Sequence, residues 1–104
     1  MKNKIIAVDL DGTLNKDYQV PDIMNKTHKE ISEFLFNSKP NIDMIKKINK
    51  LSENNYIYIF TTRSDLYKKI TEKWLNIHNV KYNNIIFNKP FYDKLIDDKS
   101  ENIK

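Results

Sequence analysis

The chain has 104 residues, 39% of them hydrophobic and 31% charged, a composition typical of one small globular domain. It has no cysteine, which excludes disulfides, thiolate zinc sites and cysteine nucleophiles. No apolar run reaches the roughly 18 residues that a membrane-spanning helix needs. The first acid, Asp9, comes too early for the apolar core of a signal peptide. We therefore expect a single domain, residues 1–104, located in the cytoplasm and without a membrane partner.

The net charge of +4 comes from lysines spread along the chain, and Arg63 is the sole arginine. Proteins that read nucleic acids rely on arginine for bidentate contacts. We therefore expect an anionic small molecule, rather than nucleic acid, as the partner that this charge attracts.

Short apolar runs alternate with helical patterns, which predicts an α/β fold with a parallel sheet of about four strands flanked by helices. The predicted strands are residues 5–10, 56–60, 85–87 and 95–96. One helix begins after Asn41, and a second follows Ser64. Their expected buried faces comprise Ile42, Ile45, Ile48 and Leu51 in the first helix, and Leu66, Ile70, Trp74 and Ile77 in the second.

Residues 15–40 are too long for a plain connection between two elements, and we interpret them as an insertion after the first strand. Thr27 and Glu30 have the spacing of a capping box, which predicts a short helix with Ile31 and Leu35 on one face. Two roles stay open for this helix: a lid over a site, or a cover for the flank of a small core.

The carboxyl ends of the predicted strands carry the candidate chemistry, because ligands of open α/β sheets bind beyond these ends. Carboxylates gathered there repel one another unless protons or a cation offset their charge. Oxygen ligands without histidine or cysteine favour Mg²⁺. Asp9 is a candidate nucleophile, since carboxylates form aspartyl-phosphates, and Asp11 is a candidate acid and base. The residues expected at this edge are Asp9, Asp11, Thr61, Lys89, Asp97 and Asp98.

The segment from Asp9 to Leu14, preceded by an apolar strand, resembles the first motif of the haloacid-dehalogenase (HAD) superfamily phosphatases. Thr61 at the end of an apolar strand resembles the second motif, Lys89 the third, and the acidic pair Asp97 and Asp98 the fourth. The four motifs stand in the family's order and span residues 5–98. The resemblance implies a Rossmann-like HAD core and a Mg²⁺-dependent phosphatase.

The resemblance also implies a role for each matching residue. Asp9 would be the nucleophile and a metal ligand, and Asp11 the general acid and base with its backbone carbonyl on the metal. Thr61 and the backbone N–H groups around Leu10 would bind phosphoryl oxygens, and Lys89 would hold the nucleophile and the phosphate. Asp97, Asp98 or both would complete the Mg²⁺ site. Further candidates are Thr62 as a substitute for Thr61, Lys94 as a substitute for Lys89, and Arg63, which either binds substrate or pairs with Asp65 or another acid.

No segment after Thr61 is long enough for a large cap domain, so we expect an essentially capless enzyme. The Lys-Pro-x-x-Asp stretch of residues 89–93, just before the Ile-Asp-Asp of residues 96–98, resembles small capless members associated with capsular or surface polysaccharide synthesis. The expected substrate is a phosphorylated sugar or glycan precursor. Two alternatives stay open: a nucleotide or nucleic-acid end phosphatase, and a non-catalytic phospho-acceptor or binding domain. A homodimer is also left open.

Overall fold

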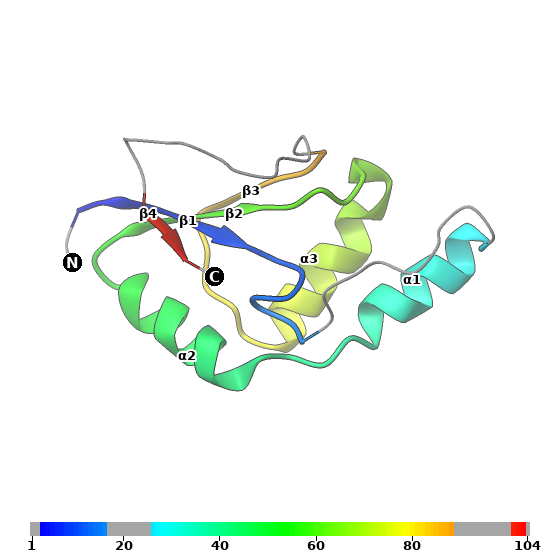
Figure 1. Cartoon of the computed structure of the whole chain (residues 1–104), viewed down its shortest axis with the longest axis horizontal. Coiled ribbons are helices and arrows are strands. Elements are labelled where there is room, and N and C mark those ends of the chain that lie inside the picture. Colours follow the sequence, from blue (N-terminus) through cyan, green and yellow to red (C-terminus); the bar gives the residue numbers. More distant parts are fainter. Residues whose placement is uncertain (1–2, 17–25, 89–100, 104) are drawn as a thin grey trace.

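The computed structural model describes residues 3–16, 26–88 and 101–103. Their strands form one parallel sheet with the order β3-β2-β1-β4 (Figure 1). The central strand β1 pairs with β2 so that Asp9 lies opposite Phe60, and it pairs with β4 on its other side. The strands are β1 (Ile5–Asp9), β2 (Tyr56–Phe60), β3 (Asn84–Ile86) and β4 (Glu101–Ile103).

The first three strands and their parallel pairing confirm the α/β prediction, with bounds that differ by one residue at β1 and β3. The strand expected at residues 95–96 lies outside the described residues. The fourth strand of the structure is β4, which follows these residues in the chain and lies at the edge of the sheet beside β1.

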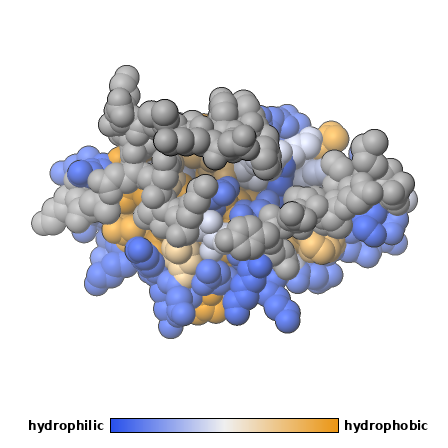
Figure 2. Space-filling view, in the orientation of Figure 1, coloured by the Kyte–Doolittle hydropathy of each residue, from blue (hydrophilic) through white to orange (hydrophobic). Residues whose placement is uncertain are grey.

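All the described helices lie on one side of the sheet (Figure 1). They are α1 (His28–Phe36), α2 (Ile42–Leu51) and α3 (Lys68–Ile77), with a short 3₁₀ turn, η2 (Asp65–Tyr67), before α3. None of them is long and apolar enough to cross a membrane. In the view of Figure 2 the described residues along the lower edge of the molecule are largely hydrophilic.

The helix after Asn41 begins as expected, because the Asn41 side chain accepts a hydrogen bond from the Met44 N–H at 3.2 Å. The buried faces expected for the two helices are each wrong in part. In α2 the buried residues are Ile45 and Ile48, whereas Ile42 in its first turn is 51% exposed. Leu66 and Ile77 are 71% and 52% exposed, and the buried residues of α3 are Thr71, Trp74 and Leu75. The cause is local: Ser64 caps η2 instead of a long helix, and α3 starts only at Lys68 with a different side facing inward.

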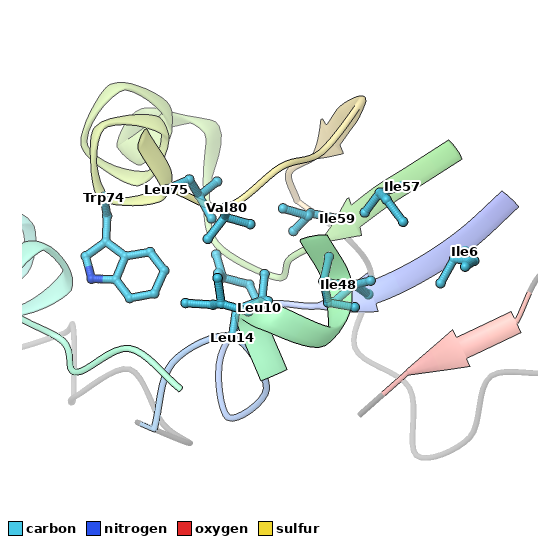
Figure 3. Packing of buried hydrophobic residues seen from close by; sticks show 11 residues of the cluster. Ile6, Leu10, Leu14, Ile48, Ile57, Ile59, Trp74, Leu75 and Val80 are labelled. Atoms are coloured by element: carbon cyan, nitrogen blue, oxygen red, sulfur yellow. The ribbon is translucent and has the colours of Figure 1, made fainter. Parts of the chain in front are cut away.

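The core lies between the sheet and helices α2 and α3 (Figure 3). Alternate residues of β1 and β2 point into it, as the two-residue period of a strand requires. Leu10 and Leu14, both fully buried, join this cluster from the loop after β1. These two leucines therefore fix the short segment between them, Asp11–Thr13, against the core. The cluster comprises Ile6, Val8, Leu10, Leu14, Ile45, Ile48, Ile57, Ile59, Trp74, Leu75 and Val80.

The two ends of the insertion meet at its base. Asn15 and Pro40 form an isolated antiparallel bridge, and the Lys16 N–H donates to the Lys39 carbonyl at 2.9 Å. Between them, α1 buries Ile31 and Leu35 and contacts α3. These contacts make α1 a cover for the flank of the core, and a lid function stays a prediction.

Candidate functional site

Asp9 and Asp11 lie on a tight turn at the carboxyl end of β1. The Leu10 carbonyl accepts hydrogen bonds from the N–H groups of Thr13 at 3.1 Å and Leu14 at 2.9 Å. Gly12, the only glycine of the chain, has φ = 82°, a conformation that costs other residues free energy. The turn therefore depends on Gly12, and it places Asp11 just beyond Asp9, the last residue of β1.

The neighbouring strand β2 ends beside this turn. Since Asp9 is in register with Phe60, the next residue, Thr61, comes level with the start of the turn. Thr61 is 1% exposed, and its hydroxyl accepts a hydrogen bond from the Arg63 N–H at 3.1 Å. Thr62, the expected substitute, is exposed. The sheet thus brings together Asp9, Asp11 and Thr61, as expected of strands that end at one edge.

Arg63 joins the two loops through a forked contact with Asp11. Its Nη2 donates to Asp11 Oδ1 at 2.7 Å, and its Nε donates to Asp11 Oδ2 at 3.1 Å. The third nitrogen, Nη1, donates to the hydroxyl of Thr71 on α3 at 3.0 Å. Charge-assisted pairs with this bidentate geometry are among the strongest hydrogen bonds in proteins. Of the two roles expected for Arg63, binding substrate or pairing with an acid, the structure shows the second. The acid is Asp11, 52 residues away in sequence.

A second side chain, that of Asn15, also holds Asp11. Its Nδ2 donates to Asp11 Oδ1 at 3.0 Å and to the Ser38 hydroxyl at 3.4 Å, while its Oδ1 accepts from the Gly12 N–H at 2.8 Å. Asn15 is 1% exposed. Its side chain therefore ties the turn, the Asp11 carboxylate and the base of the insertion into one network.

Three residues of this network were not expected from the sequence: Asn15, Ser38 and Thr71. The sequence contained one weak indication of the role of Asn15: it is a polar residue that directly follows the apolar Leu14 and stands four positions after Asp11. No pattern pointed to Ser38 or Thr71, whose roles depend on contacts between distant segments.

The other expected site residues, Lys89, Lys94, Asp97 and Asp98, lie outside the described residues. Within the described ranges no group of three or more acidic, histidine or cysteine side chains could hold a metal ion. Asp9 Oδ1 accepts a hydrogen bond from the Leu10 N–H at 3.0 Å. The backbone N–H that the resemblance assigns to phosphoryl oxygens therefore donates to Asp9 in this structure.

The donor chemistry at the turn fits a hard cation such as Mg²⁺, which prefers oxygen ligands and takes one or two carboxylates. The Asp9 carboxylate is partly exposed and can contribute an oxygen. Both carboxylate oxygens of Asp11 are held by Arg63. Asp11 would therefore contribute its backbone carbonyl as a metal ligand, as the resemblance implies.

No model of a known protein family and no curated protein matches the chain. Among solved structures it is similar to a structural-genomics target from Vibrio cholerae, with a TM-score of 0.64 and 25% identity over 91% of this chain and 79% of that one. It is also similar to a chain in the structure of the Pnkp1/Rnl/Hen1 complex, with a TM-score of 0.62 and 15% identity over 93% of this chain and 31% of that one. Together with the parallel sheet and its helices, these likenesses show that the chain has a Rossmann-like α/β fold.

Proposed function

We propose that the chain is a Mg²⁺-dependent phosphomonoester hydrolase of the HAD type that works through an aspartyl-phosphate. The observation that supports this most is the pair Asp9 and Asp11 on a glycine turn at the end of the central strand, beside Thr61 at the end of the next strand. This is the edge at which open α/β sheets bind their ligands.

In the first step, an oxygen of Asp9 attacks phosphorus and forms a new P–O bond. The bond from phosphorus to the alcohol oxygen breaks, and Asp11 gives that oxygen its proton. In the second step, Asp11 takes a proton from water as the water oxygen attacks phosphorus. The bond to Asp9 then breaks, inorganic phosphate leaves, and both aspartates return to their starting forms.

Asp9, the backbone carbonyl of Asp11, and Asp97 or Asp98 are the residues proposed to hold Mg²⁺. When bound, the ion would offset the negative charge of the phosphoryl group. The Thr61 hydroxyl, which accepts from the Arg63 N–H, still has its own proton and is proposed to donate it to a phosphoryl oxygen. Since Thr61 is 1% exposed, this contact requires the atoms that cover the hydroxyl to move when the substrate binds. Lys89, or Lys94 in its place, would supply a further positive charge.

The proposed substrate is a phosphorylated sugar or glycan precursor of the kind used in capsular or surface polysaccharide synthesis. This rests on the resemblance to small capless members of the family. The described parts support it in one respect, because residues 26–55 form only α1 and α2 as regular elements before β2, with α1 against the flank of α3. A bulky substrate could then extend away from the turn.

The test measures phosphate release from p-nitrophenyl phosphate and from a panel of sugar phosphates, with Mg²⁺ and with excess EDTA. Asp9→Asn is expected to abolish release, and EDTA is expected to do the same to the unaltered protein. The matched control is Asp43→Asn, which changes an acid in the first turn of α2 and should leave the rate unchanged.

The assignment fails if Asp9→Asn hydrolyses these esters at the normal rate. Faster release from oligonucleotide ends than from sugar phosphates would favour the nucleic-acid alternative, particularly if the affinity falls steeply with salt. A long-lived phosphorylated protein without turnover would favour the phospho-acceptor alternative.

A further inference from the structure

We propose that Arg63 is a positioning residue for Asp11, and that Thr71 of α3 anchors it from the other side. The proposal rests on the proposed function, in which Asp11 is the acid and base. In this proposal Arg63, the sole arginine of the chain, holds Asp11 in place and does not bind the substrate directly.

The first argument is that Arg63 is fixed at both its main chain and its side chain. Its N–H donates to Thr61 Oγ1 at 3.1 Å, and its carbonyl accepts from the Asn88 N–H at 2.8 Å. The guanidinium donates to Thr71 through Nη1 and to both oxygens of Asp11 through Nη2 and Nε. A planar group held at three nitrogens also fixes the plane of the carboxylate that it contacts.

The second argument is burial. The side chain of Arg63 is 3% exposed and that of Asp11 is 16% exposed. A phosphate could reach this guanidinium only by displacing Asp11, the acid that the reaction needs. A buried cation that loses its partner carries a large desolvation penalty, so Arg63 is expected to stay beside Asp11 in both the protonated and the ionised form of this acid. Oδ1 already accepts from Arg63 Nη2 and from Asn15 Nδ2, so the proton of the acid form would sit on Oδ2, which accepts from Nε at 3.1 Å and has a second lone pair.

The consequence concerns proton transfer. A general acid must place its proton on the leaving oxygen within hydrogen-bond reach, and a misplacement of about 1 Å costs on the order of 100-fold in rate. Loosening the fork at Arg63 should therefore harm most the substrates whose leaving group needs a proton. An alkyl phosphate needs this proton, whereas p-nitrophenyl phosphate leaves as a stable phenolate and needs it little.

The experiment compares kcat/KM for glycerol phosphate, an alkyl ester, with kcat/KM for p-nitrophenyl phosphate, since kcat/KM reports only the steps up to loss of the alcohol. Arg63→Lys keeps the charge and removes the fork. It should lower kcat/KM by roughly 10- to 100-fold for the alkyl ester and much less for the aryl ester, with KM little changed. Asp11→Asn should show the same selectivity, and Arg63→Lys added to Asp11→Asn should cause no further selective loss.

Thr71 supplies a matched pair of variants. Thr71→Val keeps the shape and removes the hydroxyl, so about 1 kcal/mol of hydrogen bonding, or roughly 5-fold in kcat/KM for the alkyl ester, should be lost. Thr71→Ser keeps the hydroxyl and should resemble the unaltered protein. Equal losses on both esters, or a raised KM as the main effect of Arg63→Lys, would overturn the proposal in favour of a structural or substrate-binding role.

A readout without activity separates this proposal from the proposed function. Arg63 is the only arginine, so the ¹⁵N NMR spectrum should show one arginine Nε–H signal, protected from exchange in the unaltered protein and shifted or lost in Asp11→Asn. Hydrolysis together with an unprotected signal would overturn the anchor and keep the phosphatase. A protected signal without hydrolysis of any ester would overturn the phosphatase, and with it the catalytic purpose of the anchor.

Discussion

The side chain of Asn15 shows how one amide can hold the turn that follows β1. It satisfies the Gly12 N–H and one oxygen of Asp11, and it is 1% exposed. Because the amide has both a donor and an acceptor, it serves both partners at once. An aspartate of the same shape would bring a second negative charge to Asp11.

We expect Asn15→Ala to destabilise the protein by about 1–3 kcal/mol, because it leaves the part-buried Gly12 N–H without its partner. The measurement is urea unfolding followed by the fluorescence of Trp74, which is 2% exposed and the only tryptophan. Asn76→Ala, at an exposed position of α3, is the control and should change stability by less than about 0.5 kcal/mol. Equal effects of the two variants would show that the network around Asn15 does not stabilise the turn.

At the residue scale, the sequence predicted that Asp9, Asp11 and Thr61 meet at the sheet edge, but not how they are bound to their neighbours; Lys89, Asp97 and Asp98 lie outside the described residues. Asp9, Asp11 and Thr61 are recognisable because strand ends and motifs are local patterns. The partners of Arg63 are not, since Asp11 and Thr71 come from a different loop and a helix. The tertiary structure decides which of several acids forms an ion pair with an arginine, and the spacing of residues in the sequence does not predict that partner.

At the element scale, α1 was predictable because its signal is contained within four residues. The Thr27 hydroxyl accepts from the Glu30 N–H, and Glu30 accepts from the Thr27 N–H, each at 3.1 Å. This is the reciprocal pattern that the spacing indicated. The buried face of α3 was harder, because Ser64 was interpreted as the cap of one long helix and the 3₁₀ turn η2 shifts the start of α3.

The capping box makes the stability of α1 depend on pH. Hydrogen bonds from the backbone N–H and then the hydroxyl of Thr27 lower the pKa of Glu30 below its ordinary value of 4.5. The folded state therefore favours the charged carboxylate. This stabilisation is complete above about pH 5 and is lost as the pH falls through the lowered pKa.

We expect Glu30→Ala to weaken the amide-exchange protection of α1 at pH 7, and the difference from the unaltered protein to shrink towards pH 3. Glu33→Ala removes an exposed acid later in the same helix and should show no comparable change with pH. A Glu30→Ala effect of the same size at both pH values would contradict a role for the Glu30 charge.

At the scale of the whole molecule, the parallel sheet and the shared edge of its strand ends were predictable, because they follow from the alternation of apolar runs and helical patterns. The closure of the insertion by the bridge between Asn15 and Pro40 was not. Neither was β4, whose three residues, Glu101–Ile103, have no apolar run to mark them. A strand that short is specified by its pairing with β1 rather than by its own composition.

The core that supports the site can be tested with two isoleucines of the same helix. Ile48 is fully buried in the cluster that also contains Leu10 and Leu14 on either side of the turn, whereas Ile42 is 51% exposed. Ile48→Ala should destabilise the protein by about 2–5 kcal/mol, because it removes buried methyl groups and leaves a cavity. Ile42→Ala should cost under about 1 kcal/mol, measured by urea unfolding. If the two variants cost the same, α2 does not pack as described, and the turn carrying Asp9 and Asp11 would lack the support on which the proposed chemistry depends.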